Sequence, residues 1–182
     1  MAKKVIIDVD PGIDDAIALA IALFDPGLDV LAVTATGGNV SPEQATTNLQ
    51  AIVTYLDPPR TPRIGIATEN AHMPERALSM HGPDGLGGLN LPAVPLHGSH
   101  AAEKVMWETI KAHPREVTLL CLGPPTNLSR LIRRDPSIVE LVSDTILCGG
   151  TLHANGGASP VADFNFYCDP FAARHVISEP FR

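Results

Sequence analysis

Near its start the chain reads Val5-Ile6-Ile7-Asp8-Val9-Asp10-Pro11-Gly12-Ile13-Asp14-Asp15. The apolar run from Val5 predicts a strand that ends near Val9, and Pro11-Gly12 predicts a tight turn directly after it. Residues 14–24 predict a helix that is apolar on most of its faces and is therefore buried. A strand that passes through a tight turn into a buried helix indicates an α/β fold.

The same alternation of strands and helices continues along the chain. Further strands are predicted over 29–35, 63–67, 117–122 and 145–148, and helices over 41–56, 99–113, 127–134, 137–142 and 169–177. Residues 68–98 are rich in Gly, Pro and His and have no sustained period, which predicts a long functional or disordered loop. This order predicts one doubly wound α/β domain over residues 1–182, with a mainly parallel, Rossmann-like sheet and right-handed crossovers.

The composition suits a folded domain and excludes several classes of partner. Of the 182 residues, 45% are hydrophobic and 18% are charged, which is enough apolar material for a sizeable core. A net charge of −7 disfavours nucleic acid and anionic membrane surfaces as partners, and aromatic residues, at 4%, are too few for base stacking. Three widely spaced cysteines predict free thiols in a cytoplasmic protein, and no signal-peptide core follows Lys3 and Lys4.

Doubly wound sheets bind ligands in the crevice beyond the carboxyl ends of their strands. Here the chain leaves its predicted strands at Asp10, Gly37, Gly123 and Gly149. The polar residues directly after these points are Asp14, Asp15, Asn39, Thr126, Asn127 and the segment 151–165. These residues are therefore the candidates for a binding site before any chemistry is considered.

Four carboxylates lie within eight positions at the first of these points. Asp8 and Asp10 lie on the same side of an extended strand, and Asp14 and Asp15 fall in the first turn of the helix, where the dipole favours anions. Carboxylates this close repel one another unless a cation lies among them, and hard oxygen ligands select calcium or magnesium. The alternative is that Asp14 caps the helix and the others are solvated, but capping does not explain Asp8 and Asp10 at the end of an apolar strand.

A phosphatase of the haloacid-dehalogenase type also places an Asp-x-Asp pattern after its first strand, with the first aspartate as nucleophile. In this chain that residue would be Asp8. The turn Pro11-Gly12 argues against this alternative, because the phosphatase pattern continues with a small polar residue and then Thr or Val.

A more specific resemblance comes from five motifs in order along the chain. The stretch over residues 8–16, D-V-D-P-G-I-D-D-A, resembles the signature of the nucleoside hydrolases, the inosine–uridine-preferring family. The other motifs are Gly38-Asn39-Val40, the H-G-P-D-G-L-G-G of residues 81–88, the G-P-P-T-N-L of residues 123–128, and the A-D-F-N of residues 162–165 followed by Asp169-Pro170. Together they cover nearly the whole chain.

The resemblance implies a calcium-dependent homo-oligomer, a dimer or tetramer, that hydrolyses the N-glycosidic bond of ribonucleosides and releases free base and ribose. It makes Asp10 and Asp15 carboxylate ligands of one calcium ion and Thr126 a ligand through its backbone carbonyl. Asp10 is also implied as the general base for a calcium-bound water. The implied substrate contacts are those of Asp14, Asn39, His81, Asp163 and Asn165. Carboxylates near the sugar suit this chemistry, since the bond breaks through an oxocarbenium-like state.

The chain departs from the family pattern in its sequence and in its length. Gly157 stands where the family has a ribose-binding asparagine, and Asp163 stands where the family has the longer glutamate. Family chains also continue well beyond residue 182, with a further aspartate ligand for the metal and, in several subgroups, a histidine that assists the leaving base. A chain without that part is expected to leave a face of its sheet uncovered. The alternative function is therefore a catalytically inactive, C-terminally truncated homologue that binds a ligand or a partner.

Overall fold

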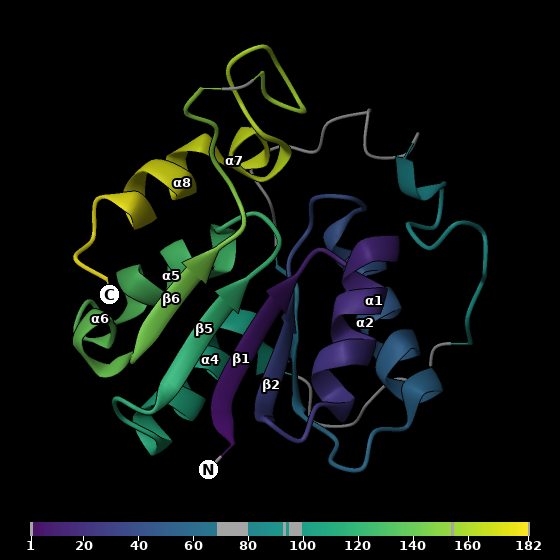
Figure 1. Cartoon of the computed structure of the whole chain (residues 1–182), viewed down its shortest axis with the longest axis horizontal. Coiled ribbons are helices and arrows are strands. Elements are labelled where there is room, and N and C mark those ends of the chain that lie inside the picture. Colours follow the sequence, from purple (N-terminus) through teal and green to yellow (C-terminus); the bar gives the residue numbers. More distant parts are fainter. Residues whose placement is uncertain (1, 69–79, 93, 95–99, 154, 182) are drawn as a thin grey trace.

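The computed structural model describes residues 2–68, 80–92, 94, 100–153 and 155–181. In this part of the chain the strands are β1 (Lys3–Val9), β2 (Leu28–Ala35), β3 (Arg63–Ile66), β4 (His100–Ala101), β5 (Val117–Cys121) and β6 (Asp144–Leu147). They form one sheet in the order β4-β3-β2-β1-β5-β6, and every neighbouring pair is parallel (Figure 1). The strand order reverses between β1 and β5, which confirms the predicted doubly wound α/β fold.

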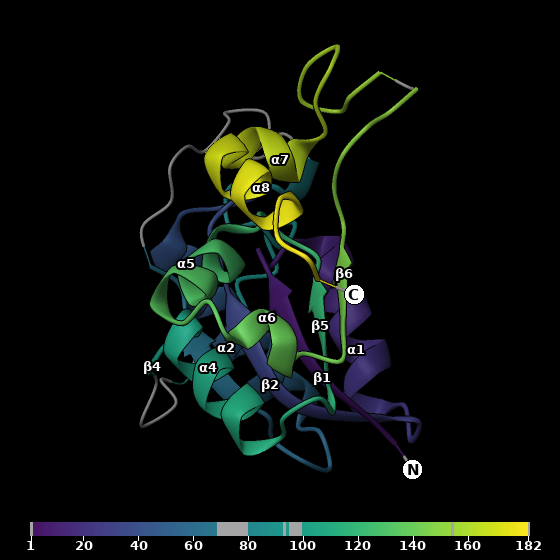
Figure 2. The same ribbon diagram turned by 90° about the vertical axis from the view of Figure 1, so that its left-hand side faces the viewer.

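Helices lie on both faces of the sheet. The described helices are α1 (Ile13–Phe24), α2 (Pro42–Leu56), α4 (Ala102–Ala112), α5 (Thr126–Arg134), α6 (Ile138–Leu141), α7 (Phe164–Cys168) and α8 (Pro170–Ile177). Figure 2 shows α1 on one side of the sheet and α4, α5 and α6 on the other. Alternate residues of β1 divide the core accordingly, since Ile7 packs with α1 and α2, whereas Ile6 packs with α4, α5 and α8.

All the strands and helices predicted from the sequence are present, with ends that differ by a few residues. The prediction for α2 is confirmed at its start, where the Ser41 hydroxyl accepts a hydrogen bond from the Gln44 amide at 3.3 Å. β4 and α7 are additional, since elements of two and five residues are too short for a hydrophobic period. The helix predicted over 99–113 begins at Ala102 because β4 precedes it, and Ser99 lies outside the described residues.

The outer face of α1 is exposed, so the prediction of a helix buried on most faces is wrong. Leu19 lies in the core, but Ile13, Ile17 and Ile21, spaced by four residues along one face, are 42–65% exposed. The reason is that β5 and β6 carry no helix on the α1 side of the sheet in the described part of the chain (Figure 1). Ile146 of β6 faces this side and is 51% exposed. The sheet is thus partly uncovered here, as the sequence leads one to expect.

Two smaller expectations concern the cysteines and the membrane. Cys121 and Cys168 are buried, Cys148 is exposed, and all three are free thiols, as predicted. No helix among the described residues is both long enough and apolar enough to cross a bilayer. The cytoplasmic location stays a prediction.

Candidate active site

The turn between β1 and α1 brings two carboxylates into the interior. β1 ends at Val9 and α1 begins at Ile13, so Asp10 follows the strand directly while Asp15 lies in the first helical turn. Asp10 is 2% exposed and Asp15 is 5% exposed. The amide of Gly12 donates a hydrogen bond to Oδ2 of Asp15 at 3.0 Å, which holds this carboxylate at the N-terminus of the helix.

Asp10 lies where the ends of β1, β2 and β5 meet. Its Oδ2 accepts a hydrogen bond from the Asn39 amide at 2.9 Å, and the Asn39 side chain donates back to the Asp10 carbonyl at 2.9 Å. Gly38 and Gly123 leave the space that this carboxylate fills, since a Cβ on Gly123 would lie 2.7 Å from Oδ1 and one on Gly38 would overlap Oδ2. Glycines of two sequence motifs therefore form a cradle for Asp10.

Burial raises the pKa of both carboxyl groups. The pKa of Asp10 is well above its usual value because of burial and because of the nearby charge of Asp15. Burial raises the pKa of Asp15 to about 6, against the hydrogen bond from Gly12, which lowers it. Within the described part of the chain, neither carboxylate forms an ion pair with a lysine or arginine. Two buried carboxylates that lack a counter-charge suit a hard cation.

The described residues supply part of the ligand set that such a cation needs. No group of three or more His, Cys, Asp and Glu side chains in this part of the structure could hold a metal ion. The predicted ligand set is not such a group, because it combines two side chains, the carboxylates of Asp10 and Asp15, with one backbone carbonyl, that of Thr126. These hard oxygen donors fit calcium, which takes roughly six to eight of them. The calcium site stays a prediction.

Asp8 is fully buried on the α5 side of the sheet. Its Oδ1 accepts hydrogen bonds from the Thr34 hydroxyl at 2.6 Å and from the Asn127 side chain at 2.9 Å. The same Asn127 amide donates to the Ala35 carbonyl at 2.8 Å, so the group ties β1 and β2 to α5. Burial raises the pKa of Asp8 to about 7. A carboxylate with no exposed surface does not reach a phosphate, which disfavours the phosphatase alternative.

Thr126, the first residue of α5, is held by a residue far along the chain. Its hydroxyl donates a hydrogen bond to Oδ2 of Asp169 at 2.8 Å, and Oδ1 of Asp169 accepts from the Ala172 amide at 2.9 Å. Asp169 thereby caps α8 and joins it to the first turn of α5. The sequence marks Asp169 as a helix start, but a partner 43 positions away leaves no local signal.

Asn165 and Asp163 hold the loops that follow β5 and β6. Both hydrogens of the Asn165 side-chain amide donate to carbonyls, that of Leu122 at 2.6 Å and that of Cys148 at 2.7 Å. Asp163 caps α7 and accepts a further hydrogen bond from the Gly150 amide at 2.6 Å. These bonds leave Oδ1 of Asn165 as its group for a ligand. The substrate contacts of both side chains remain predictions.

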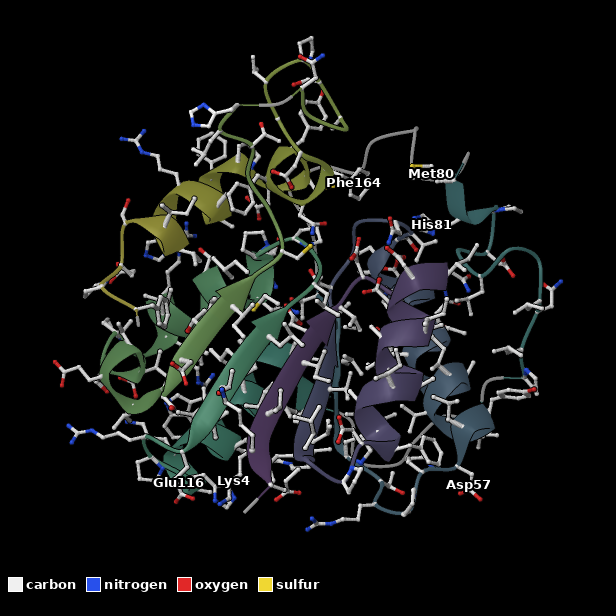
Figure 3. The ribbon with its side chains drawn as sticks, in the orientation of Figure 1. Lys4, Asp57, Met80, His81, Glu116 and Phe164 are labelled. Atoms are coloured by element: carbon white, nitrogen blue, oxygen red, sulfur yellow. The ribbon has the colours of Figure 1, made fainter. Side chains whose placement is uncertain are left out.

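His81 lies beside the N-terminal end of α1 (Figure 3). Its Nδ1 accepts a hydrogen bond from the Ile13 amide at 3.3 Å and lies 3.8 Å from Oδ1 of Asp14. A ring whose Nδ1 accepts this hydrogen bond has Nε2 as its N–H donor. The Asp14 side chain is 80% exposed. A ring donor and an exposed carboxylate thus lie side by side, a pair suited to a ligand with hydroxyl groups.

The structure brings the predicted site residues to the carboxyl edge of the sheet. One group gathers around the turn after β1 and consists of Asp10, Asp14, Asp15, Asn39 and His81. The other group lies beyond β5 and β6 and consists of Thr126, Asp163 and Asn165. Partial burial and, after it, the charge of Asp163 raise the pKa of the Cys148 thiol. An added Cβ at Gly157 would meet no described atom within 4 Å.

Comparison with solved structures defines the class to which this fold belongs. A plant nucleoside hydrolase, PpNRh1, superposes with a TM-score of 0.91 over the whole of this chain and 58% of its own, at 34% sequence identity. A purine-preferring ribonucleoside hydrolase from Gardnerella vaginalis also gives a TM-score of 0.91, over 98% of this chain and 58% of its own, at 26% identity. The fold is that of the nucleoside hydrolases.

The sequence narrows this class to one family. The model of the inosine-uridine preferring nucleoside hydrolases matches residues 5–182, and the chain belongs to that family. An inosine-uridine preferring nucleoside hydrolase of Leishmania major is 35% identical, over 98% of this chain and 58% of its own length. Uridine nucleosidase 1 of Arabidopsis thaliana is 37% identical, over 97% of this chain and 53% of its own. The chain thus spans little more than half the length of these relatives.

Proposed function

We propose that the site around Asp10 hydrolyses the N-glycosidic bond of ribonucleosides with the help of a calcium ion, and releases free base and ribose. The observation that carries this proposal is the buried pair of Asp10 and Asp15 at the switch point of the sheet, with Asp14 exposed beside it. Membership of the nucleoside hydrolase family supports the same reaction. The substrate is small and uncharged, so a net charge of −7 does not oppose its binding.

The calcium ion would be held by the carboxylates of Asp10 and Asp15 and by the backbone carbonyl of Thr126. When bound, it supplies a positive charge that lowers the pKa of a water molecule and holds the vicinal hydroxyls of ribose. The hydrogen bond between Thr126 and Asp169 supports this assignment, since it fixes the helical turn to which the carbonyl belongs.

The carboxylates have separate tasks in the proposed reaction. Asp10 takes the proton from the attacking water. The Asn39 backbone amide fixes the orientation of the Asp10 carboxylate by its hydrogen bond to Oδ2. The exposed carboxylate of Asp14 accepts a hydrogen bond from a ribose hydroxyl. Negative charge near the sugar stabilises the positive charge that develops as the bond to the base breaks.

His81, Asn39 and Asn165 complete the proposed contacts with ribose or order the water. With Nδ1 bonded to the Ile13 amide, His81 offers its Nε2 proton to a ligand oxygen, and Asn165 offers its Oδ1. Asp163 contributes through Asn165, because its Oδ1 accepts a hydrogen bond from the Asn165 backbone amide at 3.0 Å.

We further propose that the protein is a homo-oligomer, a dimer or a tetramer. The support is the exposed row of Ile13, Ile17 and Ile21 on α1, beside the uncovered face of β5 and β6. Exposed apolar surfaces of this kind are typical of contacts with another polypeptide.

The test is release of free base from inosine and from uridine by the wild-type chain, measured by chromatography in calcium and in a calcium chelator. We expect release in calcium, its loss in the chelator, and its recovery when calcium is added back. Equal release in both conditions would contradict the metal-dependent mechanism. If neither inosine nor uridine released free base in calcium, the proposed hydrolysis itself would be contradicted.

A second candidate, a homologue that binds a ligand or partner without turnover, is not favoured by the comparisons, because the matched relatives are named hydrolases and nucleosidases. Calorimetric titration with calcium, combined with the assay of base release, separates the two candidates. Calcium binding without base release supports the second candidate, whereas calcium binding with base release supports the first.

A further inference from the structure

Asn48, a residue of α2, joins two segments of the proposed active site. It is buried, with 3% of its surface exposed. Its Nδ2 donates one hydrogen bond to the Asp84 carbonyl at 2.7 Å and another to the Pro11 carbonyl at 3.2 Å. Pro11 follows Asp10 in the turn before α1, and Asp84 belongs to the loop that contains His81. The two hydrogens of one amide are therefore divided between the acidic turn and this loop.

A third hydrogen bond fixes which way the Asn48 amide faces. Its Oδ1 accepts from the Gln44 side chain, one helical turn earlier, at 2.8 Å. If the amide turned round, its Nδ2 would face the Gln44 donor and its Oδ1 would face two carbonyl oxygens. The observed orientation is the one that pairs every polar atom of the side chain.

Hydrogen bonds within the loop hold its shape, and the loop lies directly on Asn48. The Asp84 carboxylate accepts hydrogen bonds from the amides of Leu86 at 3.0 Å and Gly88 at 2.8 Å, which closes this part of the loop into a turn. Gly85 has a φ of +80°, and a Cβ there would lie 2.9 Å from Nδ2 of Asn48. The loop backbone therefore approaches the Asn48 amide as closely as only a glycine allows.

Apolar packing alone does not set where this loop lies. Leu86 is 4% exposed in the same core cluster as α1 and α2, which keeps the loop attached to the body of the protein. Such contacts are non-directional. The two hydrogen bonds of Asn48 are directional, so they fix the Asp84 carbonyl at one position relative to the Pro11 carbonyl.

We propose that Asn48 is a positioning residue for ribonucleoside binding, because it holds His81 in place against Ile13 and Asp14. His81 stands three residues before Asp84, so a shift of the Asp84 carbonyl moves the ring away from the amide that it meets at 3.3 Å. The hydrogen bonds of Asn48 go to Pro11, Asp84 and Gln44, and none goes to a proposed calcium ligand. This role rests on the proposed function, which gives His81 and Asp14 their ligand.

The first test does not depend on activity. Hydrogen–deuterium exchange is measured for the wild type, Asn48→Ala and Asn48→Asp, where the aspartate keeps the shape of the side chain and loses the two N–H donors of the amide. We expect the amides of residues 84–90 to exchange about tenfold faster in both variants, as after the loss of a hydrogen bond. The amides of α4 and β5 should keep their wild-type protection.

Thr47→Ala is the matched control for this measurement. Thr47 is the exposed neighbour of Asn48, and its hydroxyl bonds within α2 to the Glu43 carbonyl at 2.9 Å. We expect its variant to leave exchange over residues 84–90 unchanged. Wild-type exchange over these residues in Asn48→Asp, or an equal increase in α4, overturns the proposal. If the alanine variant fails to fold, the result for Asn48→Asp decides the test.

The second test is a double-mutant cycle between Asn48→Ala and His81→Ala, with a ribonucleoside as substrate. We expect each single variant to raise KM by about fivefold to tenfold, as for one lost hydrogen bond. The double variant should raise KM no further than His81→Ala, because Asn48 acts through His81. The calcium affinity of Asn48→Ala should equal that of the wild type.

Two outcomes of the cycle overturn the role of Asn48. The first is additive effects on KM, and the second is a change in kcat without a change in KM. If the wild type shows no turnover at all, the proposed function fails. The exchange measurement then still decides whether Asn48 positions the loop.

Discussion

The hydroxyl of Thr126 donates a hydrogen bond of 2.8 Å to the carboxylate of Asp169, and both residues are buried. This bond joins the first turn of α5 to the first turn of α8. The carbonyl of Thr126 is a proposed ligand of the calcium ion. The bond therefore connects the packing of α8 to the geometry of the proposed metal site.

Asp169→Ala is expected to lower stability and calcium affinity together. The variant removes the cap of α8 and leaves the buried Thr126 hydroxyl without its acceptor, which should lower the free energy of unfolding by about 2–4 kcal/mol. Urea denaturation measures the stability, and calorimetry measures the calcium affinity. Val176→Ala is the control, because it removes buried packing from the same helix and leaves the hydrogen bond intact. An equal loss of calcium affinity in both variants would show that the hydrogen bond between Thr126 and Asp169 has no specific effect on calcium binding.

Asp15→Asn is expected to stabilise the metal-free protein and to abolish its response to calcium. In the metal-free protein the buried charges of Asp10 and Asp15 repel each other. The asparagine keeps an acceptor for the Gly12 amide and removes one charge. We expect a higher Tm in chelator at about pH 8 and no further rise when calcium is added. The contrary outcome is a lower Tm in chelator with an intact response to calcium.

The stability of the metal-free protein is expected to fall as the pH rises from about 4 to about 7. Burial raises the pKa of Asp15 to about 6 and that of Asp8 to about 7, from an ordinary value of 3.8. Below the ordinary value these groups are protonated in the folded and unfolded states alike. Between the two values the folded state binds more protons than the unfolded state, so stability decreases with rising pH. For Asp15 the whole loss is about 3 kcal/mol.

Thermal unfolding in chelator at several pH values measures this dependence. Carboxyls with a lowered pKa, such as that of Asp84, titrate below the window and do not mask it. Asp15→Asn should have a shallower slope than the wild type. A Tm that rises with pH between about 5 and 7 is incompatible with a buried acidic cluster that lacks a counter-charge.

The combined substitution of Ile17 and Ile21 by lysine tests the proposed oligomer. Both side chains are more than half exposed on the outer face of α1. Light scattering should give a smaller mass for this variant than for the wild type, since lysine opposes burial of that face. Thr54→Lys, at an exposed position of α2, is the control for added charge. The same oligomeric mass in all three proteins would place the contact elsewhere, and a monomeric wild type would contradict the oligomer.

Most of the fold could be predicted because its elements carry local signals. Ser41-Pro42 marks the start of α2, and the apolar run at Val117 marks β5. The burial of α1 could not be predicted in this way. The row from Ile13 to Ile21 is apolar, but whether another segment covers it depends on the rest of the chain and not on the helix itself.

The same distinction holds for the candidate site. Asp10, Asp15 and Asn39 could be identified because each lies just beyond the carboxyl end of a predicted strand. The roles of Asn48 and Asp169 could not be predicted, because their hydrogen-bond partners lie 36 and 43 positions away along the chain. An asparagine in the middle of a helix also has no local sequence signature. Residues that hold a site together therefore emerge only from the hydrogen bonds of the folded chain.

We propose Asp10 as the base of a hydrolase site. The most direct measurement compares the rate of free base release from ribonucleosides, in calcium, by the wild type, Asp10→Asn and Asp57→Asn. Asp57 is an exposed aspartate after α2 with a φ of +44°, which asparagine tolerates, so its variant controls for the loss of a carboxylate. We expect Asp57→Asn to match the wild type and Asp10→Asn to lose about a hundredfold or more in rate. Base release by Asp10→Asn at the wild-type rate would contradict a hydrolase site at Asp10.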